Sequence, residues 1–141
     1  MRRYETIFIL RPNAGEDEIN RVVESTTQII VDEKGTIIEM NKWGMKKLAY
    51  LIKKESLGYY VFCDYAGTPA AVAEIERKFR IDDTVLKYMT IKTETSITEE
   101  EIQQAIAAVT AKETAQLESE EEETADSDDT EKKTTKETES E

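Results

Sequence analysis

Residue types that commonly carry enzymatic chemistry are scarce in this sequence. The 141 residues include no histidine, which removes the commonest general base and metal ligand. Cys63 is the single cysteine, so it cannot form an internal disulfide, and one cysteine without histidine cannot make a zinc site or a Cys–His nucleophile. We therefore interpret Cys63 as a buried structural thiol in a reducing compartment.

Phosphate-binding and carboxylate motifs are equally weak. The five glycines are widely separated, so they cannot form a phosphate-cradling loop or a dinucleotide fingerprint. Asp82 and Asp83 are adjacent carboxylates, but neighbours of this kind in a turn usually cap it or face solvent. We predict a protein that is not an enzyme and has no metal and no cofactor.

Basic residues next to aromatic residues are the most informative feature. Arg2 and Arg3 precede Tyr4, while Lys46-Lys47 and Lys53-Lys54 enclose an apolar segment containing Tyr50. Such pairs suit RNA, because cations meet phosphates and rings stack on unpaired bases. The alternative is a solvated rim of lysines balanced by nearby acids, and composition alone leaves both interpretations open.

The formal charge of −12 is spread very unevenly. Residues 1–96 contain 15 basic and 15 acidic residues, whereas residues 97–141 contain 4 basic and 16 acidic residues. The excess negative charge therefore lies in the C-terminal segment. A neutral domain with clustered cations can still bind phosphates, because the local potential matters more than the total charge.

The hydrophobic pattern predicts the order strand, helix, strand, strand, helix, strand. We expect strands at residues 3–10, at 36–40 resuming at 46–53, at 58–65 and at 84–92. Apolar positions at helical spacing predict one helix from about Glu16 to Gly35, with Gly35 in the left-handed position, and another after Thr68-Pro69. This βαββαβ order is typical of a ferredoxin-like α+β fold. Both helices should cover one face of a four-stranded antiparallel sheet.

The opposite face of that sheet is expected to be uncovered and apolar. Ile7 and Ile9 alternate with Phe8 and Leu10, so the strands offer apolar side chains to both faces. An exposed apolar sheet face usually marks a binding surface.

The C-terminal segment divides into two parts by composition. Thr98 and Glu101 form a capping-box pattern, and residues 97–117 are a possible helical extension of a domain spanning 1–96. Residues 118–141 are almost entirely acidic residues, Thr, Ser and Lys, and we predict a disordered tail. The tail could be a solubilising extension, which we favour, or a shield over basic surface. A third possibility is that the helical extension docks on the open sheet face.

Three sequence blocks resemble the family of the sixth protein of the bacterial small ribosomal subunit. The first block is residues 2–5, Arg-Arg-Tyr-Glu, before an apolar strand. The second is residues 43–52, WGMKKLAYLI, and the third is residues 79–83, FRIDD, together with residues 85–92. The resemblance covers about residues 1–95. Leu51 departs from the family pattern, which commonly has proline there.

This resemblance implies a function and a set of sites. It implies a structural component of the small subunit. Because the sequence contains no apolar run long enough for a membrane span or a signal-peptide core, we expect a cytoplasmic protein. The resemblance also implies binding to the central domain of 16S rRNA, cooperatively with the eighteenth small-subunit protein during assembly. The positions expected to contact rRNA are Arg2, Arg3, Lys46, Lys47, Lys87 and Lys92. The positions expected to contact the protein partner are Trp43, Leu48, Tyr50, Tyr60 and Phe62.

Two other classes of protein remain as alternatives. Residues 58–62, GYYVF, loosely match the aromatic strand of an RNA-recognition module, but the basic residue before the glycine is missing. A ferredoxin-like regulatory module that dimerises or holds a small ligand would use the same open face without RNA. The block at residues 43–52 argues against that module.

Overall fold

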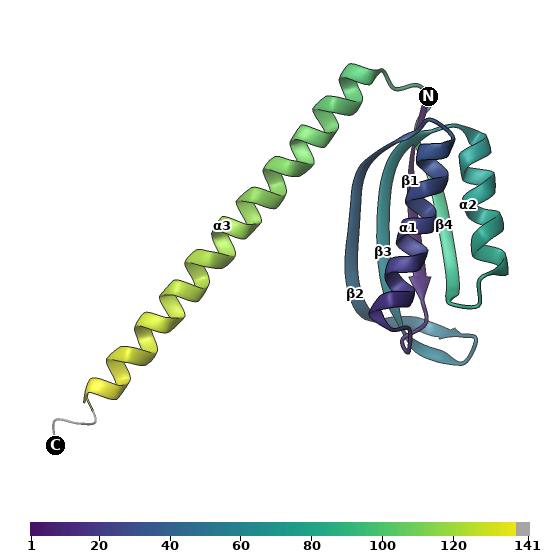
Figure 1. Ribbon diagram of the computed structural model, residues 1–141. Helices are drawn as coiled ribbons and strands as arrows, with labels where there is room; N and C mark the ends of the chain where they lie inside the picture. Colours follow the sequence, from purple (N-terminus) through teal and green to yellow (C-terminus); the bar gives the residue numbers. More distant parts are fainter. Residues whose placement is uncertain (138–141) are drawn as a thin grey trace. The chain divides into compact units, whose positions relative to one another are not determined.

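The computed structural model describes the backbone of residues 1–137 and the side chains of residues 1–122. Its elements follow the expected order, and a third helix comes after the last strand (Figure 1). The elements are β1 (Arg2–Leu10), α1 (Glu16–Asp32), β2 (Thr36–Ile52), β3 (Glu55–Gly67), α2 (Pro69–Ile81), β4 (Val85–Glu94) and α3 (Glu99–Glu137). The chain divides into two compact units, Met1–Ala105 and Ile106–Glu141.

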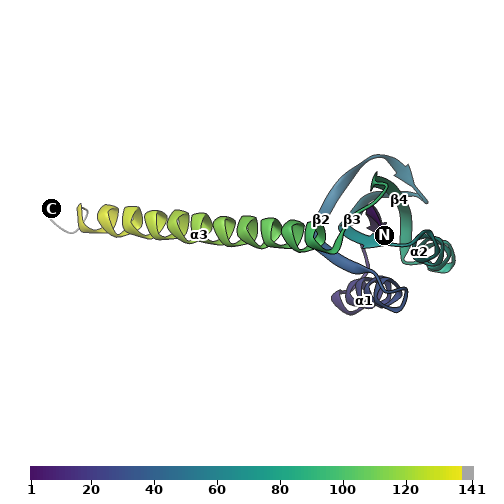
Figure 2. The same ribbon diagram turned by 90° about the horizontal axis from the view of Figure 1, so that it is seen from above.

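The first unit is a four-stranded antiparallel sheet with the strand order β2-β3-β1-β4. Helices α1 and α2 lie on the same face of the sheet, as Figure 2 shows from above. The main core lies between these helices and the sheet. It contains Tyr4, Phe8, Leu10, Ile19, Val22, Ile30, Val61, Cys63, Tyr65, Ile75, Phe79 and Val85. The predicted βαββαβ arrangement is therefore confirmed.

The end of α1 differs from the sequence prediction. Lys34, with φ 62°, takes the left-handed position that we had expected for Gly35. The amide of Gly35 donates to the carbonyl of Ile30, which closes the helix end. Gly35 is still required, because a Cβ there would lie 2.6 Å from the carbonyl oxygen of Ala66. The glycine permits a close backbone approach rather than a left-handed turn.

Strands β2 and β3 form a long hairpin that the sequence only partly revealed. The interruption expected between residues 40 and 46 is a bulge at Gly44, whose φ is 91° and where the pairing register shifts between Lys42 and Gly44. Ile52 pairs with Glu55, so Lys53 and Lys54 alone form the turn. Both residues have positive φ, 47° and 67°, as a type I′ turn requires. Strand β3 consequently starts at Glu55 rather than at Gly58.

The outer part of this hairpin, residues 45–57, is here called the hairpin arm, and it turns across the open face of the sheet (Figures 1 and 2). Leu48 of β2 packs with Ile9 of β1 and Leu86 of β4, and all three are buried. Gly58 allows this crossing, since a Cβ there would lie 2.4 Å from Cγ2 of Ile9. The expectation of a wholly uncovered face was therefore wrong. The arm covers one end of it.

Helix α3 begins with the predicted capping box. The Thr98 amide donates to the Glu101 carboxylate at 2.8 Å, and the Glu101 amide donates to the Thr98 hydroxyl at 3.3 Å. Ile97 and Ile102 are buried, whereas every side chain from Thr110 to Glu122 is exposed. The structure continues the helix to Glu137, where we expected disorder from residue 118. Glu, Ala, Gln and Lys favour helix intrinsically, and disorder of this segment stays a prediction. Residues 138–141 of the predicted tail lie outside the described residues.

Candidate nucleic-acid and protein interface

The part of the open face that the arm leaves exposed carries an aromatic cluster. Trp43 and Phe62 stack with ring centroids 5.3 Å apart and planes 6° from parallel. The bulge before Gly44 places Trp43 beside Phe62, although the two residues are not register partners. The ammonium of Lys46 lies 4.9 Å from the ring centroid of Trp43 and 5.9 Å from that of Tyr60. Cation–π contacts of this kind hold the lysine over the rings while its charge stays accessible.

Next to this cluster is a shallow apolar hollow of about 220 Å³. Its lining comes from three strands and consists of Ile7, Ile9, Tyr60, Lys87, Tyr88 and Met89. Met89 and Ile91 on β4 are about half exposed, at 49% and 47%. By register, Ile7 is opposite Met89 and Glu5 is opposite Ile91, so these side chains share the open face. We define the binding face as Ile7, Trp43, Tyr60, Phe62, Met89 and Ile91.

Arg3 at one end of the open face is engaged within the domain. Its guanidinium forms two hydrogen bonds to the buried carboxylate of Asp64, at 3.1 and 2.8 Å, and a 3.4 Å contact to Glu94. The hydrogen bonds to Asp64 are the main reason that the pKa of Arg3 is raised above its ordinary value. The charge of Arg3 is thus already compensated, and the residue holds β1, β3 and β4 together.

The structure does not gather the six predicted rRNA contacts into one patch. Lys46 and Lys87 lie on the open face, where Lys87 donates to the hydroxyl of Tyr50 at 2.6 Å. Lys47 alternates with Lys46 and points to the other side of the edge strand β2. Lys92 is the register partner of Tyr4, on the helix-covered side, and Arg2 alternates with Arg3 onto that same side.

Three of the five residues predicted to contact a protein partner lie together on one surface, and the other two do not. Trp43, Tyr60 and Phe62 come together on the binding face. Tyr50 is 60% exposed on the hairpin arm. Leu48 is only 7% exposed because it packs under the arm against Ile9 and Leu86, so it belongs to the domain's own packing.

Lys53 and Lys54 are not among the predicted site residues, although the sequence shows them as a lysine doublet. Both are exposed at the tip of the arm, and neither forms an ion pair with any described residue. The signal that could have identified them is the doublet itself, in a turn flanked by strand residues. Lysine is uncommon at the positive φ that both positions adopt, so the pattern did not suggest a two-residue turn.

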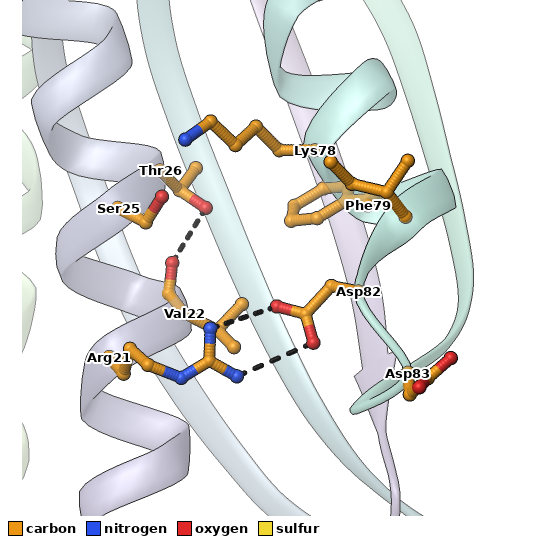
Figure 3. Close-up of a pocket in the computed structure, with 9 residues that line it drawn as sticks. Arg21, Val22, Ser25, Thr26, Lys78, Phe79, Asp82 and Asp83 are labelled. Atoms are coloured by element: carbon orange, nitrogen blue, oxygen red, sulfur yellow. Dashed lines mark hydrogen bonds and ion pairs between the residues drawn. The ribbon is translucent and has the colours of Figure 1, made fainter.

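A second hollow, of about 390 Å³, lies between α1 and α2 (Figure 3). Arg21 of α1 reaches across it to the Asp82 carboxylate, with N–O distances of 3.1 and 3.4 Å. Burial opposes ionisation of Asp82, but the hydrogen bonds from Arg21 and the Thr84 amide outweigh it and lower its pKa. Asp82 and Asp83 therefore form the turn after α2, as the sequence suggested, and Asp82 also ties the end of α2 to Arg21 of α1.

The interpretation of Cys63 as a structural thiol agrees with its surroundings. The side chain is fully buried in the main core, and burial raises its pKa to about 12. A thiol of that pKa is protonated at neutral pH and is a poor nucleophile. Within the part of the chain that the structure describes, no three acidic, cysteine or histidine side chains cluster as a metal site would need. None of the described helices is long and apolar enough to span a membrane.

These features define a ferredoxin-like α+β domain whose free sheet face combines stacked aromatics with lysines, a surface typical of a binding protein rather than of an enzyme. The comparison with known families is specific. Residues 3–92 match the family model described as ribosomal protein S6. The chain belongs to the ribosomal protein S6 family, whose members are structural proteins of the small ribosomal subunit and not enzymes. The small subunit works in the cytoplasm.

Relatives and a solved structure support this assignment over most of the chain. The small ribosomal subunit protein bS6 of Desulfotalea psychrophila is 58% identical over 116 residues, which cover 82% of this chain and 73% of that protein. The protein of the same name from Moorella thermoacetica is 39% identical over 94 residues, covering 67% of this chain and 96% of its relative. A crystal structure of 30S ribosomal protein S6 from Thermotoga maritima has a TM-score of 0.61 and 33% identity. It covers 64% of this chain and 86% of that one.

Proposed function

We propose that this chain binds the central domain of 16S rRNA together with the eighteenth small-subunit protein during assembly. Family membership supports a place in the small subunit, and the sequence resemblance supplies the expected partner. The observation that carries the proposal is the stacked Trp43–Phe62 pair with Lys46 above it. An exposed apolar surface of this kind offers a protein partner a place to pack, and the lysine at its edge offers RNA a cation.

The protein partner is proposed to cover the binding face. Trp43, Tyr60 and Phe62 would be buried on association, with the 220 Å³ hollow beside them taking an apolar side chain. Tyr50 is assigned to the rim of this contact. Leu48 is not assigned to it, because the domain already buries it.

The rRNA contacts are proposed at cations that lie on more than one side of the sheet. Lys46 and Lys87 border the binding face, while Arg2, Lys47 and Lys92 extend the positive surface around its edges. Phosphate and sugar contacts from such residues position the protein without reading base sequence. Arg3 is withdrawn from this set, since Asp64 and Glu94 already hold its guanidinium.

Partner and RNA then strengthen each other by the same factor, as thermodynamic linkage requires. The test is binding of labelled central-domain RNA to the full chain, with and without the eighteenth protein, at two salt concentrations. We expect salt-sensitive binding that appears or strengthens with the partner. Absence of RNA binding in both mixtures, with a folded protein, would reject the proposal and favour a regulatory module that uses the same face without RNA.

A further inference from the structure

The hairpin arm carries a concentrated positive charge, of which the proposed function uses only Lys46 and Lys47. Residues 45–57 contain four lysines, Lys46, Lys47, Lys53 and Lys54, and one acidic residue, Glu55. The four lysine side chains are all exposed, and none forms an ion pair with a described residue. Glu55 is engaged by Arg11 at 3.9 Å, so it adds no free negative charge at the tip.

The arm is also anchored to the sheet by several contacts. Leu48 is buried against Ile9 and Leu86, and the Tyr50 hydroxyl accepts a hydrogen bond from Lys87. Arg11 contacts Glu55 and donates to the carbonyl of Asp83 at 2.5 Å. Because the tip is held at several points, its backbone is already ordered. Binding to the lysines of the tip therefore costs little additional backbone entropy.

From these observations we infer that the tip of the hairpin arm contacts the phosphate backbone of rRNA. Lys53 and Lys54 make these contacts, and Lys47 adds positive charge beside them. This inference rests on the proposed rRNA binding, to which it adds the main cationic contact site. RNA is the ligand class that fits, because two adjacent exposed lysines without ion pairs among the described residues match a chain of phosphates better than a single small anion. The tip reads no bases, so its contribution is independent of sequence and sensitive to salt.

The turn geometry supplies a test that does not endanger the fold. Asn-Gly is the preferred pair for a two-residue turn with positive φ at both positions. The double variant Lys53→Asn/Lys54→Gly therefore removes two positive charges while suiting the observed φ values of 47° and 67°. A matched control is Lys78→Ala/Arg80→Ala, which removes two exposed positive charges from α2 on the helix-covered side.

The measurement is the affinity for central-domain RNA at several salt concentrations, with the eighteenth protein present. We expect the tip variant to bind at least tenfold more weakly at low salt. Its slope of log affinity against log salt should become shallower by about 1.5 to 2. The α2 variant should keep the slope, and Lys53→Arg/Lys54→Arg should keep both affinity and slope.

The outcomes separate this inference from the proposed function. If the unmodified chain binds RNA with its partner and the tip variant binds with unchanged affinity and slope, the tip inference is overturned and the proposed function stands. Failure of the unmodified chain to bind RNA overturns both. Partner binding without RNA is measured in parallel. A tip variant that loses affinity for the partner protein itself would make the tip a protein contact and also reject the inference.

Discussion

The ammonium of Lys87 donates a hydrogen bond of 2.6 Å to the hydroxyl of Tyr50, and its nitrogen lies 5.3 Å from the centroid of the Tyr50 ring. The two residues belong to β4 and β2, the opposite edges of the sheet. They meet only because the hairpin arm folds across β3 and β1. This contact, with Leu48 packed beside it, sets where the arm points.

Replacing Tyr50 with Phe should loosen the arm while the domain stays folded. The change removes the hydroxyl but keeps the ring, so it isolates the hydrogen bond, which is worth about 0.5–1 kcal/mol at an exposed site. We expect the amides of residues 46–52 to exchange with solvent roughly two to five times faster. Hydrogen exchange followed by mass spectrometry measures this, and equal exchange in both proteins would show that the other contacts of the arm fix it without this hydrogen bond.

Removing Arg3 should destabilise the domain strongly, because it leaves the buried carboxylate of Asp64 without its partner. We expect Arg3→Ala to lower the free energy of unfolding by about 2–3 kcal/mol in urea denaturation. The neighbouring Arg2→Ala is the matched control and should change stability by less than about 0.5 kcal/mol. Similar effects from the two substitutions would contradict a structural role for Arg3.

The junction after α1 predicts opposite effects at two adjacent positions. Lys34→Gly removes the strain of a left-handed residue and should stabilise the protein by about 0.5–1 kcal/mol. Gly35→Ala should destabilise it by about 1–3 kcal/mol, because the new methyl group meets the Ala66 carbonyl. Thermal unfolding of both variants measures the two changes in stability. If Gly35→Ala were stabilising, the backbone near Ala66 would have to move away from the new methyl group.

The Arg21–Asp82 pair predicts a pH dependence of stability. The pKa of Asp82 is lowered in the folded state, so the pair's contribution is present above the unfolded pKa, near 3.8, and is lost as pH falls through the folded value. The Arg21 side chain is 56% exposed, which limits the contribution to about 0.5–1 kcal/mol. We expect Asp82→Asn to be less stable than the unmodified protein at pH 7. The difference should shrink below pH 4, and a constant difference would assign the effect to packing.

Shortening α3 should affect electrostatics more than folding. Deleting residues 112–141 removes 4 basic and 13 acidic residues, which changes the net charge from −12 to −3. The described side chains of that segment, residues 112–122, are exposed, so the unfolding midpoint should barely change. We expect affinity for RNA to rise at low salt and the gain to vanish at high salt. A gain that persists at high salt would indicate a blocking role for the tail beyond its charge.

Four features could be predicted from the amino-acid sequence: the order of the elements, the two-sided apolar strands, the capping box and the family. These are local properties, carried by the spacing of apolar residues and by turn or capping residues a few positions apart. The predicted partner contacts include Trp43, Tyr60 and Phe62, and the structure brings these three residues together.

Long-range contacts determine which cations are free and which face of the sheet each one occupies. Arg3 and Asp64 are 61 residues apart, and nothing in the local sequence indicates that they form an ion pair. The bulges in β2 shift the alternation of side chains, so the faces taken by Trp43 and Lys46 follow from pairing with β3. A one-residue shift moves every later side chain of a strand to the other face. Leu48 was buried by an arm that crosses the sheet, a long-range event that sequence periodicity does not encode.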